Sequence, residues 1–387
     1  MTADTNPRAA AVRTAVGAVA DPELRLPIGD LNMVREITVD GPHANVSIVL
    51  TIVGCPAADR ISADVHAAAA SVPGIASVEL DVGVMTPAER KALTEQLKGG
   101  RATREMPFTA ASLTRVIAVT SGKGGVGKST MTANLAVALA QRGLAVGLID
   151  ADVHGFSIPS LMGLTDSTGA AEQPTRIDDL MLPPVAHGVK VISIGMFLRR
   201  GGDESPLGAI AWRGPMLHRT IQQFLTDVFF GDLDILLIDM PPGTGDIAIS
   251  VGQILPHAEV LVVTTPQSAA SDVAVRSGLL ARQTGQQVTG VIENMSAMVL
   301  ADGTVVDVFG SGGGLAVADA LSQDGKPVPL LASVPLSPTL REDADASAPT
   351  VIAHPDDPAA KAIGHVADAL THTQRGLSGR SLPMRVR

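Results

Sequence analysis

Short apolar runs alternate with amphipathic segments through most of the chain. The runs are bounded by turn residues and lie at 116–119, 145–149, 189–194, 235–238, 260–263, 288–292 and 328–334. Near-continuous apolar strands linked by helices are typical of a mostly parallel sheet that helices cover on both faces. Two linking helices are expected at 129–142 and 215–229, because each places its apolar residues on one stripe. This pattern predicts an α/β fold.

A smaller α/β domain is predicted in front of this sheet, over residues 1–97. Its expected helices and strands lie at 8–19, 34–39, 44–53, 57–71, 76–82 and 87–97. Residues 98–112 lack periodicity, which is typical of a linker. The larger domain is then expected at 113–372. A basic tail is expected at 373–387, where four arginines occur without an acidic residue from Gln374 onward.

Composition and charge restrict the classes of function. The chain has one cysteine, so it forms no intramolecular disulfide, and its amino terminus lacks a signal-peptide layout. The longest apolar run, near 233–240, is too short to span a bilayer. A net charge of −10 and an aromatic content of 2% disfavour nucleic-acid binding. We therefore expect a cytoplasmic protein without stable membrane association.

A glycine-rich loop of the Walker A type follows the first apolar run. The run 116–119 leads into Ser121-Gly-Lys-Gly-Gly-Val-Gly-Lys-Ser-Thr130 and then into the expected helix, which is the context that such a motif requires. The glycines let backbone N–H groups point at phosphate oxygens. We expect Lys128 to reach the phosphates of ATP and Ser129 to bind Mg²⁺. The nucleotide-binding residues expected are Gly122, Lys123, Gly124, Gly125, Val126, Gly127, Lys128, Ser129 and Thr130.

Three carboxylates occur where a nucleotide site needs them. Asp150 and Asp152 follow the run 145–149, at the end of the strand where ligands bind in open α/β sheets. Asp239 ends the run 235–238. An acid after four buried aliphatic residues is costly unless it meets a cation, and Mg²⁺ supplies one.

The first lysine of the loop, Lys123, makes the motif more specific. The sequence Lys-Gly-Gly-Val-Gly-Lys-Ser resembles the deviant Walker A of the MinD and ParA superfamily. The resemblance implies an ATPase homodimer in which Lys123 reaches the phosphates of the other subunit. It also implies that Asp152 orients the attacking water, that Asp239 holds Mg²⁺, and that Asn294 hydrogen-bonds the adenine ring. Lys123, Lys128, Asp152 and Asp239 are then the expected catalytic residues.

Further segments resemble the Mrp/ApbC family of iron–sulfur cluster carriers. In the larger domain they are Asp-Ala-Asp-Val-His-Gly-Phe-Ser-Ile-Pro (150–159), Asp-Met-Pro-Pro-Gly-Thr-Gly-Asp (239–246), Thr-Thr-Pro-Gln (264–267) and Glu-Asn-Met-Ser (293–296). In the first domain, residues 21–30 and 50–56 resemble the small domain shared with SufT- and PaaD-like proteins. The resemblance implies an ATP-hydrolysing dimer that binds iron–sulfur clusters or transfers them to apoproteins.

One departure from that family concerns the cluster ligands. Many members carry a Cys-x-x-Cys after the Asn-Met-Ser segment, but residues 297–310 contain no cysteine here. Clusters normally take four thiolates, so a cluster held by Cys55 needs a tetramer, partner thiols or small-molecule thiols. Cys55 is either a small buried hydrophobic residue or a ligand. Its place before Pro56 and a helix start predicts a lowered pKa.

Two alternatives stay open at this point. One is a spatial-organisation ATPase like MinD or ParA, which cycles on membrane or DNA. The Ala-rich segment 359–372 has no Phe or Trp, and this disfavours a membrane-binding helix there. The other is a nucleotide switch that has lost cluster binding together with the Cys-x-x-Cys.

Overall fold

A computed structural model of the chain describes residues 6–99, 106–153, 155–197, 214–300, 302–322 and 326–372. The chain divides into two compact units. Unit 1 consists of Met1–Glu105, Pro174–Val185 and Asp227–Gly231, and unit 2 consists of Met106–Gln173, Ala186–Thr226 and Asp232–Arg387. The expected tail, 373–387, and residues 100–105 of the expected linker lie outside the described residues. The domain boundaries given above stay a prediction.

Unit 1 is a three-stranded sheet with helices. Its elements are α1 (Pro7–Gly17), β1 (Val34–Asp40), β2 (His43–Leu50), α2 (Ala58–Ala70), β3 (Ser77–Val84) and α3 (Pro87–Lys98). Strand β2 pairs antiparallel with β1 and parallel with β3. Local signals fix the helix starts, since Asn6 caps α1 and Thr86 forms a capping box with Glu89 at α3.

The segment 174–185 forms a hairpin that belongs to the core of unit 1. Its strands are β6 (Thr175–Ile177) and β7 (Leu180–Leu182), which pair antiparallel. Ile177 and Leu182 are fully buried in the hydrophobic cluster that α2 and β2 also line. The Thr175 hydroxyl donates to the buried Glu23 carboxylate over 2.6 Å. The chain thus returns to unit 1 after it has entered unit 2.

Unit 2 is built on an eight-stranded sheet. Its strands are β4 (Arg115–Ser121), β5 (Val146–Asp150), β8 (Val185–Ala186), β9 (Val189–Ser193), β10 (Ile235–Asp239), β11 (Glu259–Thr264), β12 (Gln287–Ser296) and β15 (Leu330–Pro335). Their order is β15-β12-β11-β4-β10-β5-β9-β8. All seven strands from β15 to β9 pair in parallel. The predicted fold class is confirmed.

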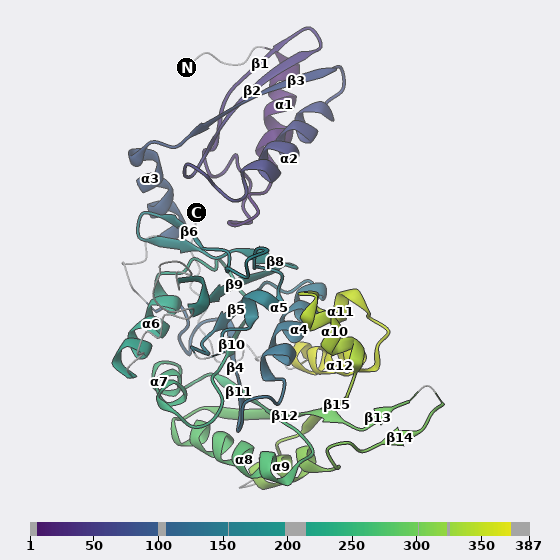
Figure 1. Cartoon of the computed structure of the whole chain (residues 1–387). Helices are drawn as coiled ribbons and strands as arrows, with labels where there is room; N and C mark the ends of the chain where they lie inside the picture. Colours follow the sequence, from purple (N-terminus) through teal and green to yellow (C-terminus); the bar gives the residue numbers. More distant parts are fainter. Residues whose placement is uncertain are drawn as a thin grey trace. The chain divides into compact units, whose positions relative to one another are not determined.

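Helices cover both faces of this sheet. They are α4 (Lys128–Gln141), α5 (Ile158–Leu161), η1 (Ile194–Phe197), α6 (Gly214–Thr226), α7 (Asp246–Ile254), α8 (Ser268–Gln283), α9 (Gly313–Leu321), α10 (Pro338–Asp345), α11 (Thr350–Ala353) and α12 (Pro358–His372). Figure 1 shows α4, α11 and α12 on one face and α7 and α8 on the other. Every residue of β4, β5 and β10 is buried, as a doubly covered parallel sheet requires.

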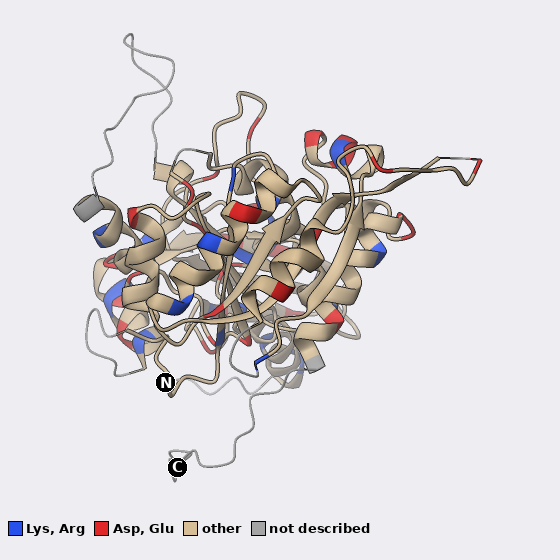
Figure 2. Cartoon of the chain, turned by 90° about the horizontal axis from the view of Figure 1, so that it is seen from below, with Lys and Arg blue, Asp and Glu red and all other residues tan. Residues whose placement is uncertain are grey.

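Charged residues of both signs are interspersed over the described elements in the view of Figure 2. Within the described ranges, no helix combines the length and the apolar character needed to cross a bilayer. A thin hairpin of β13 (Met298–Val299) and β14 (Val305–Val306) extends beyond β12 (Figure 1).

Candidate nucleotide-binding site

The loop between β4 and α4 requires glycine at several positions. Gly125 and Gly127 both have φ of 79°, a left-handed conformation that other residues rarely adopt. A Cβ atom on Gly122 would overlap the backbone nitrogen of Ala274 in α8. The loop therefore curls tightly around the start of α4, where the first N–H groups of a helix have no intrahelical partner.

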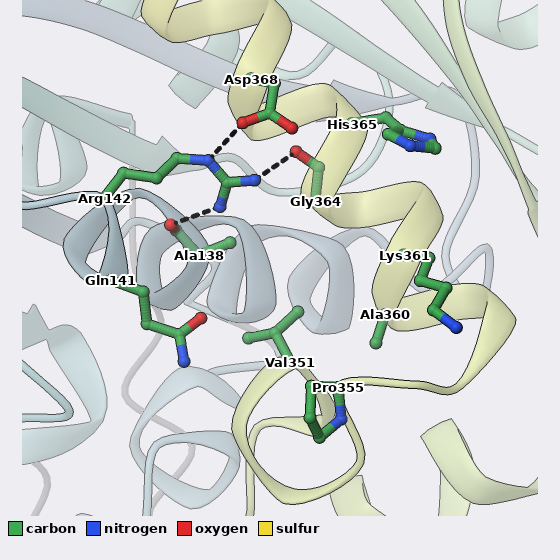
Figure 3. Close-up of a pocket in the computed structure, with 10 residues that line it drawn as sticks. All are labelled: Ala138, Gln141, Arg142, Val351, Pro355, Ala360, Lys361, Gly364, His365 and Asp368. Carbon is green, nitrogen blue, oxygen red and sulfur yellow. Dashed lines mark hydrogen bonds and ion pairs between the residues drawn. The ribbon is translucent and has the colours of Figure 1, made fainter.

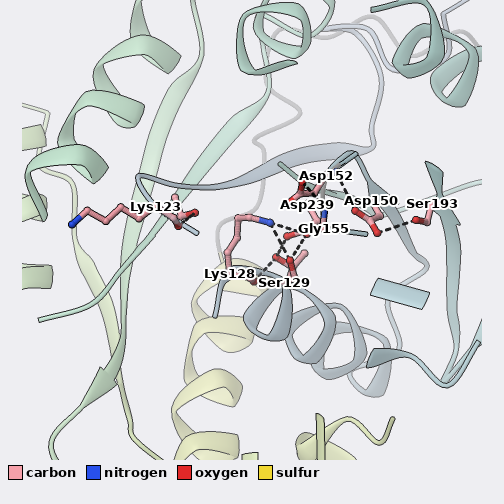
Figure 4. A network of polar contacts seen from close by, with 10 residues as sticks. Lys123, Lys128, Ser129, Asp150, Asp152, Gly155, Ser193 and Asp239 are labelled. Carbon is pink, nitrogen blue, oxygen red and sulfur yellow. Dashed lines mark hydrogen bonds and ion pairs between the residues drawn. The ribbon is translucent and has the colours of Figure 1, made fainter. Parts of the chain in front are cut away.

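The buried Lys128 and Asp239 and the half-buried Ser129 form one cluster at the start of α4 (Figure 4). The Lys128 ammonium lies 2.8 Å from Oδ2 of Asp239, and the Ser129 hydroxyl donates to the same oxygen over 2.6 Å. The Thr132 hydroxyl donates to the other oxygen, Oδ1, over 2.8 Å. Sequence reasoning missed Thr132, although its position three residues after Ser129 places it on the same helix face.

This cluster fits a magnesium–nucleotide pair. The Asp239 carboxylate and the Ser129 hydroxyl are oxygen ligands of the kind that Mg²⁺ prefers. The described residues contain no group of three or more His, Cys, Asp or Glu side chains that could enclose a metal by themselves. A few protein oxygens, with phosphates and water as the remaining ligands, are the usual arrangement for Mg²⁺.

Asp150 is fully buried beside this cluster, at the end of β5. It accepts hydrogen bonds from the Ser193 hydroxyl over 2.9 Å and from the Asp152 backbone N–H over 3.1 Å. Burial raises the pKa of Asp150 well above its usual value, and the nearby Asp239 raises it further. Asp152, which is also buried, accepts from the Gly155 backbone N–H over 3.2 Å.

Lys123 takes no part in this cluster. Figure 4 shows its side chain extending away from Lys128 and Asp239. The backbone carbonyl of Lys123 accepts a hydrogen bond from the Ser121 hydroxyl over 3.0 Å. Its ammonium group makes no ion pair or hydrogen bond with any residue that the structure describes. The two lysines of the loop therefore point in different directions.

Asn294 lies against the phosphate loop. Its side-chain amide donates to the Val126 carbonyl over 2.9 Å, and a Cβ atom on Gly127 would overlap its Nδ2. The neighbouring Glu293 is buried and accepts from the Gly314 backbone N–H over 2.6 Å, which fixes the start of α9. Asn294 thus supports the loop, and its contact with adenine stays a prediction.

The environment of Cys55 in unit 1 overturns the expected lowering of its pKa. The pKa of Cys55 is raised to about 11, chiefly by burial and to a smaller extent by Glu23 and Asp21, while hydrogen bonds with Ala57 and Thr51 oppose the rise. The prediction was wrong because Cys55 is only 6% exposed and because the charges of Glu23 and Asp21 disfavour a thiolate there. A raised pKa weakens the thiol as a free nucleophile, whereas a bound metal ion deprotonates the thiol that coordinates it.

A cavity of about 270 Å³ lies between the end of α4 and helices α11 and α12 (Figure 3). Its Arg142 donates to Asp368, to the Gly364 carbonyl and to the Ala138 carbonyl. Arg142 caps the carboxyl end of α4, about 20 Å along the helix from the phosphate loop. The arginine fastens α12 to α4, and the cavity is separate from the nucleotide site.

The stretch 297–310, which lacks the Cys-x-x-Cys, contains the hairpin β13–β14. Val299 and Val305 are both exposed on it. The only cysteine of the chain, Cys55, belongs to unit 1. The hairpin therefore offers no thiolate to a cluster.

The strand–loop–helix unit and the buried Lys128–Asp239 cluster define a nucleotide-binding P-loop protein. The family model described as NUBPL iron-transfer P-loop NTPase matches residues 112–371, and one described as iron-sulfur cluster assembly protein matches residues 9–82. The chain belongs to the ParA family of NUBPL iron-transfer P-loop NTPases. The resemblance to iron–sulfur carriers inferred from the motifs is confirmed.

Relatives match nearly the whole chain. The iron-sulfur cluster carrier protein of Mycobacterium bovis is 52% identical over 377 residues, which cover 96% of each chain. The protein of the same name from Synechocystis is 39% identical, over 92% of this chain and 95% of that relative.

Among solved structures, the nucleotide-binding protein of Archaeoglobus fulgidus in complex with ADP is 34% identical, with a TM-score of 0.49. This match covers 61% of the present chain and 87% of that one. MinD of Pyrococcus horikoshii, complexed with Mg-ADP, is 25% identical with the same TM-score of 0.49. That match covers 66% of this chain and 96% of the other.

Proposed function

We propose that this chain is an ATP-hydrolysing carrier that binds iron–sulfur clusters and transfers them to apoproteins in the cytoplasm. The observation that carries the proposal is the Lys128–Ser129–Asp239 cluster at a phosphate loop. The chain that contains it belongs to a family of iron-transfer P-loop NTPases. Relatives named as iron–sulfur cluster carriers match both the nucleotide-binding region and the first domain.

The cluster suggests how the chain's own residues handle the nucleotide. The Lys128 ammonium forms an ion pair with Asp239 over 2.8 Å. When ATP binds, its phosphates are a second anionic partner for this ammonium. Ser129 and Asp239 would hold Mg²⁺, which neutralises charge that develops on the phosphates during transfer. Asp152, which follows the end of β5, is then the residue that orients the attacking water.

The direction of Lys123 supports a homodimer. A loop lysine that points away from its own carboxylates is available to the phosphates of a second copy of the chain. A cation supplied in this way to the transferring phosphoryl group raises the rate of phosphoryl transfer. We therefore propose that two copies enclose the nucleotides, each contributing its Lys123 to the partner's site.

The iron–sulfur cluster is the cargo, and Cys55 is the one thiolate that a chain can contribute. A site with four thiolates then needs outside thiols or a higher oligomer. Anaerobic reconstitution with iron and sulfide, followed by an absorption spectrum and an iron count, tests the proposal. We expect iron loading that depends on added low-molecular-weight thiol or that drives the chain into higher oligomers.

Two variants sharpen this experiment. Cys55→Ser should lose the iron and retain ATP hydrolysis, because Cys55 and the phosphate loop belong to different units. Val53→Ala, at an 83% exposed position two residues away, is the matched control and should load iron like the parent. Full iron loading of Cys55→Ser contradicts the role of Cys55, and no loading of the parent under any thiol condition contradicts carriage.

A further inference from the structure

The end of β9 holds the loop that carries Asp152. Ser193, the last residue of β9, is fully buried, and its hydroxyl donates to Oδ2 of Asp150 over 2.9 Å. The other oxygen of Asp150 accepts the backbone N–H of Asp152 over 3.1 Å. The Ser193 oxygen itself accepts the backbone N–H of Gly195 over 3.1 Å. One chain of hydrogen bonds therefore runs from Gly195 through Ser193 and Asp150 to the backbone of Asp152.

A second contact holds the same loop at Phe156. A Cβ atom on Gly195 would lie 2.5 Å from Cδ2 of the Phe156 ring, so the ring packs directly on the Gly195 backbone. We call residues 151–157 the β5–α5 loop; residue 154 lies outside the described residues. The segment from Ser193 to Gly195 thus contacts the β5–α5 loop near its end and, through Asp150, near its start.

We propose that Ser193 and Gly195 are positioning residues, which set the place of Asp152 for ATP hydrolysis through Asp150 and Phe156. The inference rests on the proposed ATPase function and adds residues that belong to neither the phosphate loop nor the carboxylates. Neither residue takes part in the hydrogen bonds that join Lys128, Ser129 and Asp239.

The expected effect is on turnover rather than on nucleotide binding. Ser193→Ala removes a hydroxyl from a fully buried place and leaves one oxygen of Asp150 without its donor. Asp150 can then rotate, and this weakens the hydrogen bond that it accepts from the backbone of Asp152. Because a displacement of about 1 Å at a catalytic group costs about 100-fold in rate, we expect kcat to fall by about 10- to 100-fold. The KM for ATP should change by less than about two-fold.

The test compares Ser193→Ala with Ser193→Thr and with Ser322→Ala in steady-state ATPase assays. The Ser322 hydroxyl also donates to one acceptor and accepts one backbone N–H, but it lies between α9 and residue 328. Ser193→Thr keeps the hydroxyl and should recover most of kcat, while Ser322→Ala should keep the parent kcat. Thermal unfolding and ADP affinity, measured in parallel, separate a local effect from misfolding.

The contact between Gly195 and Phe156 supplies an independent variant series. Gly195→Ala should lower kcat, because its methyl group displaces the Phe156 ring. If both residues act through this one contact, Gly195→Ala combined with Phe156→Ala loses no more activity than the worse single variant. Losses that multiply in the double variant overturn the proposed contact.

The outcomes also separate this inference from the proposed function. ATP hydrolysis is first measured in the parent protein and in Lys128→Ala. Hydrolysis by the parent that is lost in Lys128→Ala establishes the ATPase activity, and the Ser193 variants are then compared with the parent. An active parent whose kcat is unchanged in Ser193→Ala, or whose KM rises instead, overturns the positioning role alone. A parent without ATP hydrolysis overturns both proposals.

Discussion

Asp150 and Asp239 lie directly opposite each other on the neighbouring parallel strands β5 and β10, and both are fully buried. The Lys128 ammonium lies 2.8 Å from Oδ2 of Asp239, and its effect on Asp150 is weaker than the effects of burial and of Asp239. Two adjacent carboxylates in a buried place do not readily ionise together. Burial and the neighbouring Asp239 therefore favour the protonated form of Asp150.

This relationship predicts how stability depends on pH. The pKa of Asp150 is raised above its ordinary value of 3.8, by burial first and by Asp239 second. Between the ordinary pKa of the unfolded chain and the raised pKa of the folded chain, the folded chain binds more protons than the unfolded chain. The contribution of Asp150 to stability therefore falls as the pH rises through that range. In Asp150→Asn the free energy of unfolding should decline less with pH. Urea titrations in EDTA at several pH values measure the free energy of unfolding. An equal dependence of this free energy on pH in parent and variant would contradict the prediction.

Lys128→Ala should abolish detectable ATP binding. The variant removes the cation nearest the expected phosphates and leaves Asp239 buried without its ion pair. Truncating one partner of a buried charge pair costs about 2–5 kcal/mol. Isothermal calorimetry measures the affinity, with Lys361→Ala as the control, because Lys361 is an exposed lysine paired with Asp356. Unchanged affinity in Lys128→Ala would refute the phosphate-loop assignment.

Lys123→Ala should leave ATP binding nearly intact and suppress turnover. Its ammonium has no partner among the described residues, so its loss disturbs little within the same subunit. A cation supplied from a partner to the transition state raises the rate by about 10³–10⁵. We expect a loss of kcat in this range, measured by phosphate release, with ATP affinity within about three-fold of the parent.

Mixing Lys123→Ala with Asp152→Ala tests the origin of that cation. In a mixed dimer, the subunit with an intact Asp152 receives an intact Lys123 from its partner, so one working site is restored. If Lys123 served its own subunit, neither site would be complete. Heterodimers that form without recovering activity would speak against action in trans.

Cys55 should react slowly with alkylating reagents. Its pKa of about 11, against an ordinary value of 9.0, leaves about 100-fold fewer molecules as thiolate near neutral pH. The rate should rise about tenfold per pH unit up to about pH 11. Because the chain has one cysteine, iodoacetamide labelling followed by mass spectrometry is unambiguous. The urea-unfolded chain is the control, and equal rates for folded and unfolded chains at about pH 7.5 would contradict the burial of the thiol.

Local patterns in the sequence were sufficient to predict the sheet and the phosphate loop. The strands of unit 2 are continuous apolar runs, and the glycines of the loop are required by its backbone conformation. Each signal lies within a few residues along the chain, so the pattern is visible without knowing the tertiary structure.

The supporting contacts of the site could not be predicted in this way. Ser193 lies 43 residues from Asp150, and Asn294 lies 168 residues from Val126, the loop residue that it contacts. A serine at the end of a strand or an asparagine after one has many ordinary roles. Only the pairing of β5 with β9, and the packing of Asn294 on the loop, give these residues their partners.

The hairpin 174–185 was missed for a related reason. Its strands β6 and β7 are three residues long, which is too short for a period-2 pattern to distinguish them from a loop. Its membership of unit 1 is a tertiary fact, because the segment lies far along the chain from the other elements of that unit.

Ile177→Ala should destabilise unit 1 by about 2–5 kcal/mol, since the cavity that it leaves adds to the lost burial. Ile177 is fully buried in the core of unit 1, together with residues of α1 and α2. Val53→Ala, at a position 83% exposed, is the control and should change stability by less than about 0.5 kcal/mol. Urea unfolding, followed by the accessibility of Cys55 in the same unit, distinguishes the two variants. Equal midpoints would show that the hairpin contributes nothing to the fold of unit 1.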